Sequence, residues 1–381
     1  MKWETVKLGD VTDSCLGKML DQNKNKGTPQ PYLANVNVRW GGFDLDNLSE
    51  MRFEEHEQER YVLQYGDLVV CEGGEPGRCA IWKDEIPNMK IQKALHRVRV
   101  HEDMDYRYLF YWFLHAGKRG ALDQYFTGAT IKHMPGDKLK TIEIEKPPLS
   151  VQKRIADILS AYDDLIENNQ KQIKLLEEAA QRLYKEWFID LRFPGYETTP
   201  VHNGVPEGWE NVPIDNAFSI KYGKNLPTSL VSKSGRYPVY GANGVIGFYK
   251  EKNCDDYVVL ITSRGNGSGD VLKTLHKESF VTNNSFIVVG KRSSLGVPFS
   301  HQMMMSADFK SVCTGSAQPQ LTNNSISTLN VILPSEHLIE NYNKLADPMY
   351  ETVINLVIQN DLLIEARDRL LPKLMNGEIE V

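Results

Sequence analysis

Phosphate chemistry in this chain would require its glycine–lysine pairs or its glycine-rich segment. A nucleotide-binding P-loop needs a glycine upstream of the Gly-Lys pair and a hydroxyl residue directly after it. The Gly-Lys pairs begin at Gly17, Gly117, Gly223 and Gly290, and none has either feature. Backbone amides of segment 265–269 (GNGSG) could bind a phosphate, but the residues after it are typical of a strand where a dinucleotide site needs a helix. The sequence therefore predicts a tight turn at 265–269 and no use of ATP by this chain.

Methyl transfer and metal chemistry have equally few candidates. Residues 347–350 (DPMY) are similar to the Asp-Pro-Pro-Tyr loop of amino-methyltransferases, but they lack the second proline and lie within an apolar series of helical period. The nine histidines have no spacing that would place two ligands on one helix face, and the five cysteines lack a zinc or redox spacing. We therefore predict no catalytic residue, no metal site, and the reduced thiols of a cytoplasmic protein.

Length and charge limit the class of protein. A chain of 381 residues, with 41 % hydrophobic and 25 % charged residues, predicts two or three globular domains. Its apolar runs, such as 257–261, are too short to span a membrane, and its N-terminus lacks a secretory signal. The net charge of −6 argues mildly against nucleic acid, but acidic residues concentrate at 50–59 and in helical segments, whereas several basic residues lie in predicted loops.

The chain contains an internal repeat. Four pairs of segments match in the same order, and they are 3–6 with 209–212, 66–70 with 255–259, 127–129 with 314–316, and 144–147 with 331–334. The last two pairs share one offset along the chain, whereas the first pair has another. The two halves therefore have the same plan, with loops of different length.

Each half ends in a long apolar series of helical period. Apolar or small residues recur with three-four spacing from position 155 to 187 and from 342 to 374. Pro147-Pro148 and Pro334 stand where helices start, and Gly377 stands where a C-terminal cap is expected. Because neither helix can hide its apolar seam alone, we expect the two to pack on each other, antiparallel and related by a pseudo-two-fold axis.

The predicted fold class is α+β, with two repeated globular α/β domains joined by two long antiparallel coiled-coil helices. Segment 193–208 (FPGYETTPVHNGVPEG) has the composition of an inter-domain linker. The expected boundaries are a first globular domain at 1–146, a first long helix at 147–192, the linker at 193–208, a second globular domain at 209–333, a second long helix at 334–376 and a tail at 377–381.

On this plan, several phrases resemble the specificity-subunit family of type I restriction-modification systems. They are 147–149 (PPL) with Gln152, 179–190 (AAQRLYKEWFID), 222–227 (YGKNLP), 237–249 (YPVYGANGVIGFY) and 370–378 (LLPKLMNGE). The resemblance covers essentially the whole chain. It implies two target recognition domains, each recognising one half of a bipartite site on double-stranded DNA, and helices that hold two methyltransferase subunits.

The resemblance also implies that chemistry belongs to partner subunits. The methyltransferases use S-adenosylmethionine to methylate adenine, and restriction subunits translocate DNA with ATP and Mg²⁺. The chain itself is then expected to be a non-catalytic DNA-binding subunit that binds no cofactor.

Polar and basic side chains on predicted loops are the candidates for base recognition, because Arg and Lys suit guanine edges and Asn and Gln suit adenine. In the first half they are Asn37, Arg39, Arg78, Thr130, Lys132 and His133. In the second half they are Lys224, Asn243, Arg264, Asn266, Gln318 and Gln320. The loops after Gly128 and Gly315 are favoured, because they occupy matched places and carry different side chains. For each residue, a solvated loop side chain or a turn-forming Asn is at least as good an interpretation as a base contact.

Four residues of the long helices have two interpretations each. Asn169 and Asn360 interrupt the apolar series, so each either faces solvent or is buried in the seam, where it would fix the register. Trp187 and Phe188, at the end of the first helix, either belong to the core or bind a partner subunit.

Two other functions stay open. The chain could be the specificity component of a related type II restriction-modification system with nuclease activity, against which the missing methyltransferase and nuclease motifs count. It could also be a coiled-coil adaptor that binds protein alone, which the acidic charge favours. Two divergent glycine-rich domains are more than such an adaptor needs.

Overall fold

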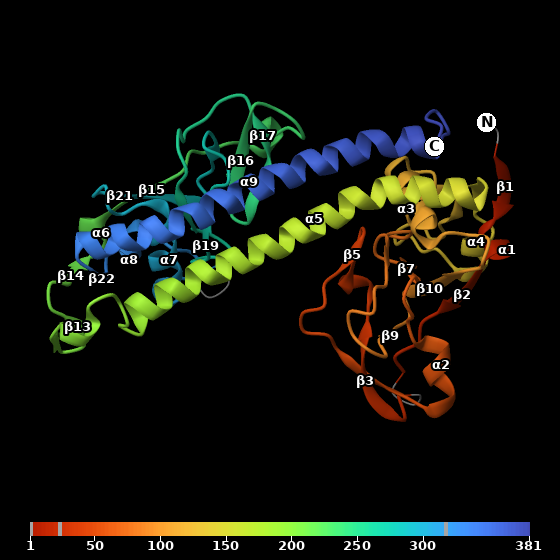
Figure 1. Ribbon diagram of the computed structural model, residues 1–381, viewed down its shortest axis with the longest axis horizontal. Helices are drawn as coiled ribbons and strands as arrows, with labels where there is room; N and C mark the ends of the chain where they lie inside the picture. Colours follow the sequence, from red (N-terminus) through yellow and green to blue (C-terminus); the bar gives the residue numbers. More distant parts are fainter. Residues whose placement is uncertain (1–2, 22–24, 316–318) are drawn as a thin grey trace. The chain divides into compact units, whose positions relative to one another are not determined.

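The computed structural model describes residues 3–21, 25–315 and 319–381 (Figure 1). The chain forms two compact units: unit 1 comprises Met1–Ile166 with Leu362–Val381, and unit 2 comprises Glu167–Asp361. Each unit contains one sheet-based domain and one part of each long helix. The predicted α+β fold class, with two repeated domains and two long antiparallel helices, is confirmed.

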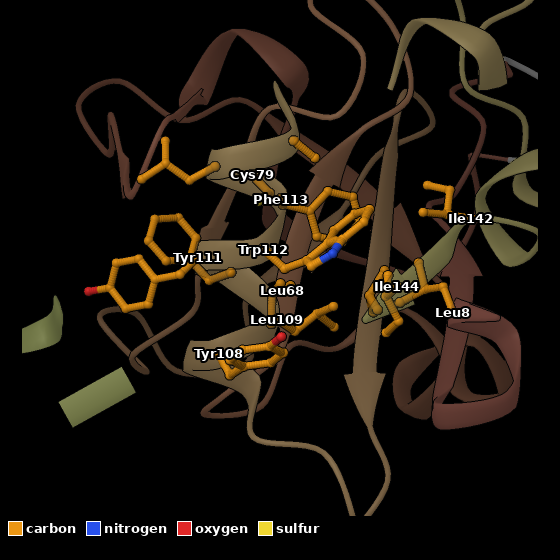
Figure 2. Packing of buried hydrophobic residues seen from close by; sticks show 14 of the residues in the cluster. Leu8, Leu68, Cys79, Tyr108, Leu109, Tyr111, Trp112, Phe113, Ile142 and Ile144 are labelled. Atoms are coloured by element: carbon orange, nitrogen blue, oxygen red, sulfur yellow. The ribbon is translucent and has the colours of Figure 1, made fainter. Parts of the chain in front are cut away.

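The centre of unit 1 is an antiparallel sheet of four strands, covered by helix α3 (Tyr106–Lys118). The strand order is β2 (Thr12–Leu16), β10 (Leu95–Val100), β7 (Leu68–Cys71) and β8 (Cys79–Ile81). Leu68 and Val70 of β7 pack in the cluster that contains α3, whereas Val69 and Cys71 pack in a second cluster. Since side chains alternate along a strand, β7 is buried on both faces. Figure 2 shows Leu68 beside the aromatic side chains of α3.

Short elements complete unit 1. The strands are β1 (Glu4–Lys7) paired with β11 (Glu143–Lys146), β3 (Thr28–Leu33) between β6 (Glu50–Phe53) and β9 (Lys90–Ile91), and β4 (Val38–Arg39) paired with β5 (Gly42–Phe43). The short helices are α1 (Leu8–Val11), α2 (Gln58–Tyr61) and α4 (Gly136–Lys140). Strand β3 is antiparallel to β6 and parallel to β9.

Unit 2 repeats this topology. Its four-stranded sheet has the order β15 (Phe218–Tyr222), β21 (Ser285–Gly290), β18 (Val259–Thr262) and β19 (Val271–Lys273), and its covering helix is α7 (Val297–Ser306). The other elements are β14 (Glu210–Pro213) paired with β22 (Asn330–Leu333), β16 (Tyr237–Gly241) between β17 (Gly244–Tyr249) and β20 (Phe280–Val281), the hairpin β12 (Val201–His202) with β13 (Val205–Pro206), and the helices α6 (Ile214–Ala217) and α8 (Asn323–Ile326). Strand β16 is parallel to β20, as β3 is to β9.

Helices α5 (Leu149–Tyr184) and α9 (Glu336–Met375) pair within each unit. In unit 1, Arg367 of α9 forms an ion pair with Asp163 of α5. In unit 2, Asn169 bonds Asn360, and the Tyr342 hydroxyl donates to the Ala180 carbonyl at 3.1 Å. Later residues of α5 meet earlier residues of α9 in unit 2, so the helices are antiparallel there. None of the helices in the described ranges is both long and apolar enough to cross a membrane.

Candidate nucleic-acid interface

In unit 1, three loops meet beyond the end of β7, and we call residues 34–41, 72–78 and 127–133 loop cluster 1. His133 forms β-bridges with both Thr127 and Gly73. The Asn35 side chain reaches the Gly73 carbonyl, and the Arg78 guanidinium donates to the Asn35 carbonyl at 2.9 Å. These bonds join all three loops, so cluster 1 is one connected surface.

Unit 2 builds the same arrangement beyond β18, and we call residues 241–244, 263–270, 314–315 and 319–320 loop cluster 2. Gln320 forms β-bridges with both Thr314 and Arg264, as His133 does with Thr127 and Gly73. The Thr262 hydroxyl donates to the Ala242 carbonyl at 2.7 Å and fastens the first of these loops. Equivalent backbone bonds therefore hold different side chains in the two clusters.

Most of the predicted polar residues in cluster 1 are engaged inside the protein. The Asn37 side chain accepts from the Ala34 amide at 2.9 Å and donates to the Asp44 carbonyl at 3.1 Å, so it forms the turn. Arg39 lies 3.5 Å from the Asp44 carboxylate. Arg78 lies 2.8 Å from the Glu75 carboxylate.

The loop from Gly128 to His133 is exposed. Gly128 has a φ of +92°, and a Cβ there would lie 2.2 Å from the Ile131 carbonyl oxygen, so the loop requires glycine. Lys132 lies 3.3 Å from the Asp123 carboxylate and 5.6 Å from the centre of the Phe126 ring. Thr130 and the His133 side chain face solvent.

The predicted residues of unit 2 are less engaged. Asn243, Arg264 and Asn266 are exposed, and Gln320 is half-buried. Within the described part of the chain, Arg264 has no carboxylate partner. Asn243 lies against the turn at 265–269, which is closed by the Ser268 amide donating to the Gly265 carbonyl. Gln318 lies outside the described residues.

Lys224 has a structural counterpart in unit 1 that the matched segments of the two halves of the sequence did not include. Both Lys18 and Lys224 follow a glycine whose Cβ would meet a backbone oxygen, at 2.4 Å for Gly17 and 2.3 Å for Gly223. Both form a parallel bridge, Lys18 with Gln92 and Lys224 with Thr282. The shared Gly-Lys pair was a signal for this equivalence, although it was considered only as part of a phosphate loop.

The two lysines differ in their surroundings. Lys18 is 3 % exposed and bonds the Glu57 carboxylate and the Arg52 carbonyl. Burial raises the pKa of Glu57, but hydrogen bonds from Lys18 and from the Glu54 amide outweigh burial and lower it. Lys224 is exposed and has no side-chain partner among the described residues. Glu57 also lies near Glu54 and His56, whose side chains could bind a metal ion together with it. The Glu57 carboxylate, however, already forms an ion pair with Lys18.

The two helix asparagines are buried and bonded to each other. Asn169 is 2 % exposed, and its amide donates to Asn360 at 2.9 Å and to Gln359 at 3.1 Å. Phe188 is 8 % exposed and packs against Tyr342, whereas Trp187 is half-buried. Residues 347–350 lie inside α9.

A family comparison identifies the origin of this duplicated arrangement. Residues 1–178 and 206–338 match the family described as the type I restriction modification DNA specificity domain. The chain belongs to this family. It is a specificity subunit of a type I restriction-modification system, a non-catalytic DNA recognition component.

Individual relatives agree with this assignment. The specificity subunit is 27 % identical over 345 residues to the MjaIX type I specificity subunit of Methanocaldococcus jannaschii, covering 84 % of this chain and 79 % of that protein. It is 24 % identical over 413 residues to the MjaVIII specificity subunit of the same organism, covering 100 % and 93 %. The crystal structure of an S subunit from M. genitalium has the same fold, with a TM-score of 0.60 at 18 % identity over 98 % of this chain and 96 % of that one.

Proposed function

We propose that this specificity subunit recognises a bipartite site on double-stranded DNA, one half-site through each loop cluster. The target recognition domains would be residues 1–146 and 209–333. The observation that supports this is that the two loop clusters share one backbone arrangement but carry different side chains. The β-bridge between Gly73 and His133 in unit 1 corresponds to the β-bridge between Arg264 and Gln320 in unit 2. A protein that recognises two different half-sites needs such a difference, because base edges are distinguished by side-chain chemistry.

The long helices would dock the partner subunits. Two methyltransferase subunits would bind to helix segments 147–192 and 334–376. The linker 193–208 would connect the first of these segments to the second domain, and the tail 377–381 would follow the second segment. Exposed leucines on α5 and α9 support this role, among them Leu175 and Leu362. Trp187 is the more accessible of the two proposed partner-binding aromatic residues, because Phe188 is buried.

Chemistry would then reside in the partners, in the cytoplasm. The methyltransferase subunits would use S-adenosylmethionine, and the restriction subunits would use ATP and Mg²⁺. Because this chain has a net charge of −6, we expect the partners to supply much of the positive surface that a DNA duplex requires.

Methylome sequencing tests the assignment of half-sites. The chain is produced with its methyltransferase subunits as wild type, as Thr130→Ala with His133→Ala in cluster 1, and as Asn266→Ala with Gln320→Ala in cluster 2. Each double variant should relax or abolish one half of the methylated motif and leave the other half intact. An exposed pair in the linker, outside both clusters and both long helices, is the control for general effects: Glu197→Ala with Glu207→Ala. Equal loss at both half-sites in either variant would show that the clusters do not divide the recognition.

A further inference from the structure

Loop cluster 1 has few polar groups left to recognise bases. The side chains of Asn37, Arg39, Arg78 and Lys132 all have partners within unit 1. A guanidinium or amide that already bonds the protein must lose that bond before it can bond a base, which reduces the net gain. Side chains without such partners are therefore better placed to provide discrimination in this half of the protein.

Ile131 is such a side chain, and it lies at the centre of the matched loop. It is 64 % exposed, although isoleucine has no polar group that favours contact with water. The backbone around Ile131 is fixed by two features. The Ile131 carbonyl lies close to Gly128, and the backbones of Thr127 and His133 are hydrogen-bonded to each other. The loop thus presents an apolar side chain from a fixed backbone.

The surroundings of Ile131 suit an apolar ligand group. Ile131 borders a hollow of about 610 Å³ with a mixed lining. Trp40, Phe126 and Pro76 are its apolar side, and its charged side chains are already paired within unit 1, Glu75 with Arg78 and Asp123 with Lys132. The aromatic and apolar side of this hollow, next to an exposed isoleucine, favours the burial of a small apolar group there. The only apolar group on the base edges of the major groove is the 5-methyl group of thymine.

We propose that Ile131 contacts the 5-methyl group of a thymine in the half-site recognised by loop cluster 1. This inference rests on the proposed DNA-binding function and names a residue and a base feature for it. The contact would distinguish thymine from cytosine at one position without any hydrogen bond. It would leave Arg39, Arg78 and Lys132 in their ion pairs.

Deoxyuridine tests the contact directly, because it differs from thymidine only in lacking that methyl group. The complex of the full chain with its methyltransferase subunits is titrated with duplexes that carry its methylated motif. Each thymine of the cluster 1 half-site is replaced in turn by deoxyuridine, on both strands, and binding is followed by fluorescence anisotropy at one salt concentration. Wild type, Ile131→Ala and Ile131→Val are compared, with Ile332→Ala as the matched control, since Ile332 is an exposed isoleucine on β22.

For wild type, we expect one deoxyuridine to weaken binding about fourfold, which corresponds to one buried methyl group. Ile131→Ala should bind the thymine duplex about as weakly as wild type binds that deoxyuridine duplex, and should not discriminate between the two. Ile131→Val should keep part of the discrimination, and Ile332→Ala should behave as wild type.

Three results would overturn the inference: a wild type that is insensitive to every deoxyuridine in that half-site, an Ile131→Ala variant that keeps the full wild-type response, or a half-site without a thymine. Failure of the proposed function has a different signature. In that case the complex would show no sequence-specific binding at all, or the cluster variants would not separate the two half-sites.

Discussion

Lys18 in unit 1 and Lys224 in unit 2 occupy the same place in the two repeats and have different surroundings. Lys18 is buried against Glu57, whereas Lys224 is exposed and without a side-chain partner among the described residues. The loop clusters differ in the same way. Arg78 of cluster 1 is paired with Glu75, and Arg264 of cluster 2 has no carboxylate partner in the described ranges. A duplicated backbone can therefore use a cation for stability in one copy and leave it available to a ligand in the other.

Paired and free cations should respond differently to substitution. A paired cation contributes to folding, and its attraction for a phosphate is offset by the neighbouring carboxylate. A free cation contributes little to folding and can neutralise a phosphate or bond a base edge. We therefore expect unit 1 and unit 2 to differ more in what their cations do than in how their backbones fold.

The largest effect is expected for Lys18→Met. Removing one member of a buried ion pair leaves the Glu57 carboxylate without its partner, so we expect the free energy of unfolding of unit 1 to fall by about 3 kcal/mol. Lys224→Met at the equivalent position should leave stability unchanged and weaken DNA binding. Urea unfolding of both variants measures the difference. A similar loss of stability in the two variants would show that burial does not distinguish the lysines.

Arg264→Gln should have the next largest effect, on binding. Loss of a free guanidinium at a base edge should cost about 2 kcal/mol of affinity for the cognate duplex and relax the preference at one base of one half-site. Arg39→Gln is the comparison in cluster 1, where the guanidinium is held by Asp44. Its effect on affinity should be below about 0.5 kcal/mol. Anisotropy titrations at fixed salt measure both, and equal losses would contradict the distinction between paired and free cations.

Asp44→Asn should give cluster 1 a cation like those of cluster 2. Without the carboxylate, Arg39 is free to neutralise a phosphate, so the slope of log affinity against log salt should steepen by about 0.9. The double variant Asp44→Asn with Arg39→Gln should return the slope to the wild-type value. A slope that steepens equally in the double variant would show that the lost negative charge, and not Arg39, causes the change.

The smallest effect concerns acid stability. The pKa of Glu57 is lowered in the folded state, because hydrogen bonds from Lys18 and the Glu54 amide outweigh the opposing effect of burial. A lowered pKa contributes stability above the unfolded value of about 4.3, and that contribution is lost as pH falls through the folded value. Wild type should therefore lose more stability than Lys18→Met as pH falls from about 5. Urea unfolding across this range measures it, and parallel curves would exclude a role for this carboxylate.

Much of the fold followed from local patterns. The three-four spacing predicted the two long helices, now seen as Leu149–Tyr184 and Glu336–Met375. The matched glycines, Gly128 and Gly315, both have positive φ and lie in the bridged loops of their units. These features are visible in sequence because helix period and glycine conformation depend on residues close along the chain.

The state of the candidate residues did not follow from such patterns. Asn37 was a candidate for a base contact, with a turn residue as at least as good an interpretation, and its side chain forms two hydrogen bonds within a turn. Phe188 had even interpretations as core or partner contact, and it is buried beside Tyr342. Ile131 was not a candidate, because only polar and basic side chains were expected to recognise bases. An exposed apolar residue within a matched loop is the signal that was available.

The sequence by itself determined the duplication and the two long helices, since both are recorded in residue types at short or matched spacing. The family followed from the resemblance of several sequence segments. Tertiary structure decided which cations are free. Lys18 meets Glu57 across 39 positions of the chain, and Asn169 meets Asn360 across 191. Such contacts depend on how strands and helices pack. The lysine of the Gly-Lys dipeptide is therefore buried in an ion pair in unit 1 and exposed in unit 2. The physical reason is that the groups around a charge in space, and not its neighbours along the chain, decide whether it is paired within the protein or available to a ligand.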